Sequence, residues 1–229
     1  MKNLILDLTP PLFLRWYNTV KGNQNRYLKR NNQVLECFPI NFEVLEFSYI
    51  DKGFEFDYQW GWWSRIFEYP LVLNKMRALG WNNSSKVHNT CWGSQGCHIL
   101  FKEQLEQGSK FVVNSDINRS ELPNTTVYDL TKTPSDEFLD DFDFVLNVST
   151  LEEIRFPHLM VFQNLLSMVK PGGYLIATFD IPGLDLQMFE KLFGKKISQV
   201  AERVTGGNSP YLMTQYSHLE VGYMVIKRL

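Results

Sequence analysis

Apolar and polar positions follow two spacings in the second half of the chain, and the change between them predicts alternating strands and helices. Residues 86–90 are predicted as a strand because a glycine loop at 91–96 and helical spacing at 97–107 follow them. Apolar runs predict strands at residues 110–114, 142–147, 174–178 and 219–226, and a short strand is expected at 125–128. Strands that alternate with helices in this way are typical of a parallel α/β sheet.

Pro171-Gly172-Gly173 marks the clearest boundary in this region. The helix expected at residues 157–169 ends before it, and the apolar strand at 174–178 follows at once. Proline fixes φ and cannot continue a helix, while glycine supplies the positive φ of a tight turn. We therefore predict a tight turn between this helix and this strand.

The N-terminal part of the chain has a different pattern. Alternation at residues 42–47, a turn at Asp51-Lys52-Gly53 and aromatic side chains at every second position of 54–60 predict a β-hairpin with one aromatic face. Such a face usually packs on a core, and the alternative is a platform that stacks on a sugar or a base. We expect residues 1–64 to form an N-terminal extension and residues 65–229 to form the α/β domain.

Composition narrows the class of protein. With 229 residues, of which 44% are hydrophobic, the chain can bury a sizeable core. Its net charge of −2 argues against nucleic acid as the main partner. The three cysteines do not suggest a disulfide framework, and no apolar run approaches the ~20 residues of a membrane-spanning helix. We expect a cytoplasmic protein without a membrane span.

Candidate chemistry gathers where the predicted strands end. The loop of Gly93 and Gly96, the carboxylates of Asp116 and Asp129, and the polar segment 147–153 all follow strands directly. In an open parallel sheet, ligands bind at the carboxyl ends of the strands. A glycine loop lets the backbone approach a ligand, and an acid after the second strand can accept hydrogen bonds from ribose hydroxyls. No Gly-Lys-Ser/Thr sequence is present, which argues against a P-loop NTPase.

Residues 86–178 resemble a Rossmann-like (class I) S-adenosylmethionine-dependent methyltransferase. The family pattern Val-Leu-Asp-hydrophobic-Gly-Cys-Gly-x-Gly lies over residues 87–96, and the segments 142–146, 149–154 and 169–173 are similar to the family's fourth strand, the loop after it and a later turn. Arg65-Ile66-Phe67-Glu68-Tyr69-Pro70 is similar to a helix start in methyltransferases encoded with surface-polysaccharide genes. The resemblance implies a three-layer α/β fold with a mostly parallel sheet, an antiparallel C-terminal strand and S-adenosylmethionine as cofactor.

The resemblance also implies roles for single residues. Asp116 matches the acid that binds the ribose, and Asp129 matches the acid that contacts the adenine amino group. The expected cofactor-binding residues are Asn89, Cys91, Trp92, Gly93, Gly96, Asp116, Ile117, Asp129, Leu130 and Asn147. Methyl transfer is an in-line displacement, and a hydroxyl or amine acceptor benefits from a base, for which the candidates are Glu152, Glu153 and His98. The acceptor, a small molecule or a glycan, is expected against Trp60, Trp63, Arg65 and Tyr69.

The first motif departs from the family pattern and leaves alternatives open. Asn89 stands where the family has an acid, Cys91 where it has its first loop glycine, and Trp92 where it has a small residue. A neutral amide forms a weaker hydrogen bond than a carboxylate. One alternative is therefore a methyltransferase-like domain that binds a ligand or a partner without turnover. Another is a nucleotide-sugar or nicotinamide enzyme, although the chain lacks Gly-x-Gly-x-x-Gly.

Metal binding is the remaining candidate chemistry near the first motif. His88, Cys91, Cys97 and His98 lie close together in the sequence. Their spacing does not match that of common structural zinc sites, and His88 falls inside a predicted buried strand. We expect no metal, and we expect the cysteines to act as small apolar residues.

Overall fold

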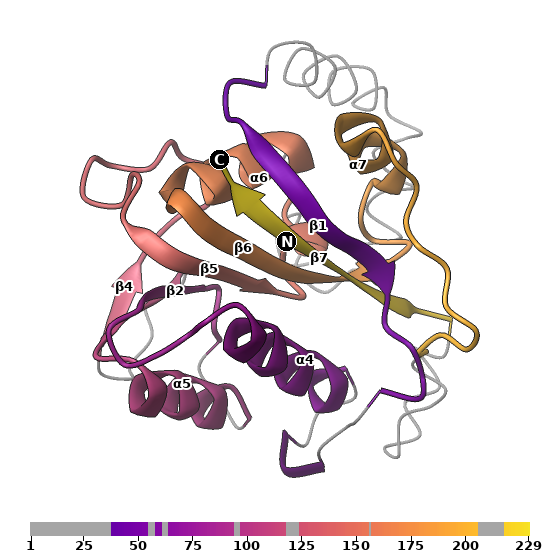
Figure 1. Ribbon diagram of the computed structural model, residues 1–229, viewed down its shortest axis with the longest axis horizontal. Helices are drawn as coiled ribbons and strands as arrows, with labels where there is room; N and C mark the ends of the chain where they lie inside the picture. The colour runs from indigo at the N-terminus through magenta and orange to yellow at the C-terminus, as the bar shows by residue number, and fades with distance from the viewer. Residues whose placement is uncertain are drawn as a thin grey trace, which may run out of the picture.

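The computed structural model describes residues 38–54, 58–60, 64–93, 97–117, 124–155, 157–205 and 218–229. Seven strands within these ranges are β1 (Phe42–Tyr49), β2 (Lys86–Thr90), β3 (Phe111–Asp116), β4 (Thr125–Val127), β5 (Phe142–Val148), β6 (Val169–Ile181) and β7 (Glu220–Arg228). They form one sheet in the order β1-β7-β6-β5-β2-β3-β4 (Figure 1). The chain moves from β2 towards β4 in one direction and from β5 towards β6 in the other. The strand order therefore reverses between β2 and β5, where open α/β sheets bind ligands.

The directions of the strands match the fold expected from the sequence. β2 pairs in parallel with β3 and β5, β3 with β4, and β5 with β6. The C-terminal strand β7 pairs antiparallel with β6 and with β1, so β1 runs in the same direction as β6. The prediction of a mostly parallel, Rossmann-like sheet with an antiparallel C-terminal strand is confirmed.

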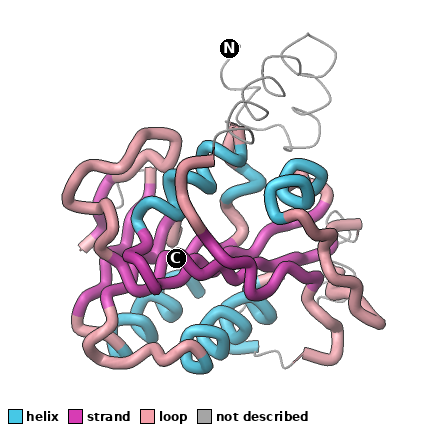
Figure 2. Tube along the Cα trace, turned by 45° about the horizontal axis from the view of Figure 1, so that its top comes forward, coloured by secondary structure: helices cyan, strands magenta, loops and turns pink. Residues whose placement is uncertain are grey.

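Helices cover both faces of the sheet and complete three layers (Figure 2). α4 (Arg65–Ala78) and α5 (Cys97–Gly108) pack on one face, and α6 (His158–Met168) and α7 (Leu186–Phe193) pack on the other. Successive residues of a strand point to opposite faces, so Val145 joins the cluster with α6 while Leu146 joins the cluster with α4. Two short 3₁₀ turns, η1 (Tyr58–Trp60) and η2 (Leu151–Glu153), lie beside these layers.

The β-hairpin predicted near the N-terminus is wrong. β1 pairs with β7, from Phe42 opposite Arg228 to Tyr49 opposite Gly222, and Tyr58–Trp60 forms a 3₁₀ turn. β1 therefore belongs to the main sheet, although it was expected in a separate extension. Phe47 explains why β1 pairs with β7 and not with residues 54–60. Its side chain is buried and packs on Phe179 of β6 and Phe193 of α7. Residues 21–33, a polar and basic segment whose composition predicts a solvated loop, lie outside the described residues.

The Pro171-Gly172-Gly173 segment lies within β6, where no strand was predicted, and Gly172 has the positive φ expected for this segment. β6 begins at Val169, which pairs with Phe142, and regular pairing resumes with Tyr174 opposite Phe144. The segment between them is an irregularity in the ladder, where Gly172 adopts a φ of 81°. A Cβ on Gly173 would lie 2.8 Å from the carbonyl oxygen of Asp143, so this position requires glycine. None of the helices in the described ranges has the length and apolar character needed to cross a membrane.

Candidate active site

The loop after β2 leaves the sheet through two left-handed backbone conformations. Cys91 has a φ of 53° and Gly93 a φ of 73°. Glycine adopts such angles without strain, whereas a residue with a Cβ pays for them sterically. The backbone N–H of Trp92 donates to the carbonyl oxygen of Ser115 at 3.3 Å, which holds the loop beside the end of β3. Cys91 thus occupies a position that favours glycine, as the family pattern has it.

The acids that follow β3 and β4 lie close to this loop. Burial, and to a smaller extent the charges of Asp116 and Asp129, raise the pKa of the Cys91 thiol to about 12, although a hydrogen bond with Thr150 opposes this increase. The thiol is therefore neutral at pH 7 and is a poor nucleophile. Cys91 after β2 therefore interacts with residues that follow or end β3, β4 and β5, namely Asp116, Asp129 and Thr150.

Asp129 is hydrogen-bonded within its own loop, and the apolar residues next to the two acids, Ile117 and Leu130, differ in exposure. Asp129 Oδ1 accepts hydrogen bonds from the Thr131 hydroxyl at 2.7 Å and its backbone N–H at 3.0 Å, which lower the pKa of the carboxyl below its usual value. Ile117, next to Asp116, is 59% exposed, which is unusual for a large apolar side chain. Leu130 is buried in the core. The loop edge therefore offers an ionised carboxylate and an exposed apolar side chain.

Asn89 and Asn147 make their described side-chain contacts within the protein. Asn89 Nδ2 donates to Asn114 Oδ1 at 3.0 Å, across the face of the sheet that α5 covers. Asn147 Nδ2 donates to Thr90 Oγ1 at 3.0 Å, and its Oδ1 accepts from the backbone N–H of Leu151 at 3.0 Å. Both amides are buried, and they connect neighbouring elements around the edge.

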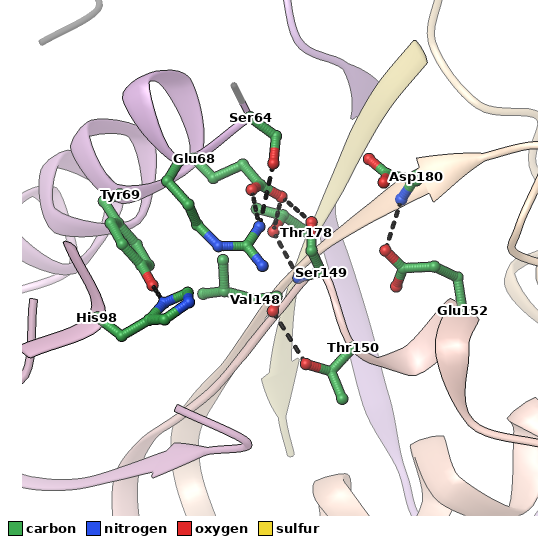
Figure 3. Close-up of polar contacts among 11 residues, drawn as sticks. Ser64, Glu68, Tyr69, His98, Val148, Ser149, Thr150, Glu152, Thr178 and Asp180 are labelled. Atoms are coloured by element: carbon green, nitrogen blue, oxygen red, sulfur yellow. Dashed lines mark hydrogen bonds and ion pairs between the residues drawn. The ribbon is translucent and has the colours of Figure 1, made fainter. Parts of the chain in front are cut away.

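Glu68 organises a second cluster where α4 meets the ends of β5 and β6 (Figure 3). Its side chain is fully buried, and its carboxylate forms an ion pair with Arg65. It also accepts hydrogen bonds from the hydroxyls of Ser149 and of Thr178, the latter at 2.6 Å. Burial alone would raise the pKa of the carboxyl, but Arg65 and the hydroxyl donors, Ser64 among them, outweigh it and lower the pKa. Glu68 is therefore ionised and joins α4 to the two strands. Its role was not predicted, because no pattern in the sequence distinguishes it among the mostly apolar residues that begin this helix.

Tyr69 and His98 connect this cluster to the glycine loop (Figure 3). The Tyr69 hydroxyl is hydrogen-bonded to His98 Nδ1, and the Tyr69 ring stacks on Phe101 with centroids 4.1 Å apart. Burial and the charge of Arg65 lower the pKa of His98 to about 4, and the charges of Glu68 and Asp116 oppose this decrease. A Cβ on Gly93 would lie 2.8 Å from His98 Cδ2, so the loop passes directly over the ring. The neutral ring has little driving force to act as the base expected from the sequence.

Glu152 and Asp180 form an acid pair beside Glu68 (Figure 3). Glu152 is 6% exposed, and its Oε1 accepts the backbone N–H of Asp180 at 2.9 Å. Burial and the charge of Asp180 raise the pKa of Glu152 well above its usual value, and burial and the charge of Glu68 raise the pKa of Asp180 to about 8. The sequence analysis missed Asp180, although an acid at the carboxyl end of an apolar strand was a usable signal. Glu153, the third candidate base, is exposed.

The aromatic residues expected against the acceptor are only partly described. Trp60 is 2% exposed and packs edge-on against Tyr69 and Phe101, with centroids 5.3 and 6.2 Å away. For Trp60, this arrangement fits the expectation that the aromatic side chains pack on the core, and not the alternative of a stacking platform. Trp63 and Gly96 lie outside the described residues. Arg65 and Tyr69 lie in the cluster around Glu68 and His98.

A cavity of about 220 Å³ lies at the opposite end of the sheet. Its lining residues include Ser85, Asp143, Lys170 and Gly173, where β2, β5 and β6 begin. The acids described above are at the other ends of these strands, so this cavity is separate from the candidate site. Over the described ranges, no group of three or more His, Cys, Asp or Glu side chains could hold a metal ion.

No protein-family model matches the sequence, and no curated protein matches it. Among solved structures, the chain is similar to the trans-methyltransferase CalH in complex with S-adenosylhomocysteine, with 12% identity and a TM-score of 0.49, over 74% of this chain and 58% of that one. It is similar to the N-methyltransferase NodS from Bradyrhizobium japonicum, with 15% identity and a TM-score of 0.44, over 70% and 85% of the two chains. A methyltransferase from Aquifex aeolicus has 16% identity and a TM-score of 0.47, over 72% and 93%. The chain spans less than two thirds of the length of CalH. The fold assignment rests on the strand order and directions described above.

Replacing Glu68 tests the buried ion pair. Glu68→Gln keeps the shape of the side chain but leaves the Arg65 guanidinium buried without a counter-charge, so we expect a loss of about 3–5 kcal/mol of unfolding free energy. Urea denaturation measures it. Glu202→Gln is the matched control, because Glu202 pairs with Lys52 at 3.4 Å with side chains 70% and 50% exposed. The control should change by less than about 1 kcal/mol; equal losses in the two variants would contradict the assignment.

The left-handed conformation of Cys91 gives a second expectation. Cys91→Gly and Cys91→Ala both remove the thiol, but only alanine keeps the Cβ that opposes a φ of 53°. We expect the glycine variant to be more stable than the alanine variant by about 1 kcal/mol in urea denaturation. Glu103, exposed in α5, is the control position, where alanine should be the more stable of the two by a similar amount. The same order at both positions would exclude strain at Cys91.

The acid pair makes stability depend on pH. The folded protein keeps a proton on Asp180 up to pH about 8, whereas the unfolded chain releases it above pH about 4, so stability falls as pH rises between these values. Asp180→Asn cannot ionise and should be more stable than the natural chain at pH 8.5, by about 1–4 kcal/mol, with a smaller difference at pH 5. Thermal unfolding at both pH values measures it. Asp136→Asn, at an exposed position, should show no such gain, and a gain that is independent of pH would disprove the cause.

Proposed function

We propose that this protein is an S-adenosylmethionine-dependent methyltransferase that acts on a small molecule or a glycan. The observation that carries the proposal is the arrangement at the reversal of strand order. There, a loop with left-handed conformations at Cys91 and Gly93 faces the carboxylates of Asp116 and Asp129. Such a loop exposes its backbone to a ligand, and carboxylates at this edge can accept hydrogen bonds from ribose and adenine.

The residues at the edge fit the parts of this cofactor. Asp116 would accept hydrogen bonds from the ribose hydroxyls, and the exposed side chain of Ile117 would pack on the adenine ring. Asp129 uses one oxygen for Thr131, and its other oxygen would accept from the adenine amino group. The loop from Cys91 to Gly93 would pass along the amino-acid part. When bound, the cofactor supplies a methyl group on a positively charged sulfur, which makes the thioether a good leaving group.

The protein's own contribution to methyl transfer is placement. An in-line displacement requires the acceptor atom, the methyl carbon and the sulfur to be aligned, and it is favoured when water is excluded. The hydrogen bonds of Glu68 with Ser149 and Thr178 hold α4 against β5 and β6, and the hydrogen bond of Tyr69 orients the ring of His98. These contacts would form a rigid wall on the acceptor side of the cofactor. Asn89 and Asn147 would act on the cofactor only by holding the strand ends together.

A second candidate is a domain that binds a ligand or a partner without turnover. Three features of the first motif favour it. Cys91 carries a Cβ where the backbone favours glycine, and Asn89 donates its amide to Asn114. Trp92 is buried with its indole Nε1 unpaired, so a large side chain occupies the loop.

Calorimetric titration with S-adenosylhomocysteine tests the proposal, with NAD and UDP-glucose as controls. We expect saturable micromolar binding of the thioether alone. Asp116→Ala should lose about 1–3 kcal/mol of binding free energy, because its hydrogen bonds to the ribose are charge-assisted. Asp136→Ala, at an exposed position away from the edge, should bind as the natural chain does. Absence of binding at millimolar ligand would favour the second candidate, and unchanged binding by Asp116→Ala would remove the proposed ribose contact.

A further inference from the structure

Three buried polar atoms of one cluster have no hydrogen-bond partner among the described residues. They are Arg65 Nε on α4, Glu152 Oε2 on η2 and Asp180 Oδ1 at the end of β6. Each such atom costs about 1–3 kcal/mol when it is left unpaired, and native structures contain few of them. The three side chains interact electrostatically, because Arg65 lowers the pKa of Asp180, and Asp180 raises that of Glu152. Unpaired groups gathered at the edge where the strands end indicate a ligand that pairs with them.

The chemical types of these atoms restrict the ligand. Arg65 Nε–H can only donate a hydrogen bond, whereas the oxygens of an ionised carboxylate can only accept one. A hydroxyl satisfies both needs through a single atom, because it has lone pairs and a proton. A protonated amine has no lone pair for the arginine, and its charge would be repelled by the guanidinium. A neutral amine has both a lone pair and a proton, but its nitrogen attacks carbon without the help of a base, so an acid poised to take a proton favours a hydroxyl. A carboxylate ligand has no proton to donate and would be repelled by the acids.

Asp180 is the acid of this cluster best suited to take a proton. Glu68 is committed to Arg65, Ser149 and Thr178, and Glu152 uses one oxygen to accept the backbone N–H of Asp180. The charged and titratable groups that act on Asp180 are Glu68 and Arg65 from α4 and Glu152 and Glu153 from η2. Together with burial, they give Asp180 a pKa of about 8, close to the operating pH that suits a general base.

We propose that the methyl acceptor reacts through a hydroxyl group, with Asp180 as the catalytic base and Glu152 as the residue that positions it. This inference rests on the proposed methyltransferase function and names its substrate class. The acceptor hydroxyl lies between Arg65 Nε–H and the Asp180 carboxylate. Its oxygen forms a bond to the methyl carbon while the carbon–sulfur bond breaks, and the electron pair of that bond stays on sulfur. The hydroxyl proton passes to Asp180 Oδ1, and the products are a methyl ether, a neutral thioether and a protonated Asp180.

The test uses matched pairs of compounds that differ in the reacting group. Phenol and aniline, cyclohexanol and cyclohexylamine, and glucose and glucosamine are each incubated with the full chain and methyl-labelled S-adenosylmethionine. We expect label in methyl ethers from hydroxyl members and none on the amine nitrogens. kcat/KM should rise tenfold per pH unit below pH about 8 and then level, because only ionised Asp180 accepts the proton.

The Asp180→Asn variant removes the proposed base, and its affinity for S-adenosylhomocysteine shows whether the fold and the cofactor site are kept. We expect this variant to lose kcat/KM by about 100-fold or more and to lose the rise with pH. Its affinity for S-adenosylhomocysteine should stay within twofold of the natural chain, because Asp180 is outside the cofactor edge. Asp136→Asn should keep full activity. Label on the amines alone, more than a third of the activity left in Asp180→Asn, or an unchanged pH profile in that variant would each overturn the proposal.

Direct binding covers the case in which no compound of the panel is methylated. NMR titration of the complex with S-adenosylhomocysteine should show binding of at least one hydroxyl member, weakened tenfold or more by Asp180→Asn. If no hydroxyl member binds, or if the amines bind more tightly than their hydroxyl partners, the proposal is wrong. The titration of the natural chain with S-adenosylhomocysteine alone reports separately on the methyltransferase function.

Discussion

A carboxylate that is removed from water must be both neutralised and hydrogen-bonded, and the structure meets this constraint at Glu68. Arg65 supplies the charge, and Ser149 and Thr178 supply hydroxyl protons from the ends of β5 and β6. One side chain of α4 is therefore connected to two strands of the sheet. Ser149, which adopts a φ of 41°, donates to this carboxylate, and the next residue of α4, Tyr69, is hydrogen-bonded to His98. The acceptor side of the proposed cofactor site is built around a single buried charge.

In the neighbouring acid pair, Glu152 and Asp180, the pKa values shift in the opposite direction from that of Glu68. Glu68 has its charge balanced, so its pKa is lowered, whereas Glu152 and Asp180 have no counter-charge of their own and their pKa values are raised. The pair therefore opposes folding at alkaline pH. Acids whose pKa values are raised in this way lower the stability of the folded state as the pH rises. They occur most often at functional sites, because catalysis needs groups whose pKa suits proton transfer. The contrast between adjacent carboxylates in different environments gives them separate roles.

Features that depend on local sequence patterns were predicted correctly, whereas features that depend on contacts between distant residues were not. The strands β3 and β5 were predictable because they contain short apolar runs, and β2 because a glycine loop and a helix follow it. Asp116 and Asp129 became candidates because strand ends converge in a parallel sheet. The hairpin was wrong because β1 gains more by pairing with β7 and burying Phe47 than by pairing locally. The Pro171-Gly172-Gly173 segment has the composition of a turn, yet pairing on both sides keeps it within β6.

The α/β class, the approximate strand positions and the edge at which acids gather could be inferred from residue order, since these depend on the period of apolar residues and on chain direction. The protonation state and the contacts of each side chain at that edge depend on how the chain folds. Glu68 was inconspicuous in an apolar helix start, and Asp180 lies 28 residues from Glu152, whose Oε1 accepts its backbone N–H. The burial and the neighbouring charges that set their pKa values arise only when α4, β5 and β6 pack together, because electrostatic environment depends on distance in space and not on distance in sequence.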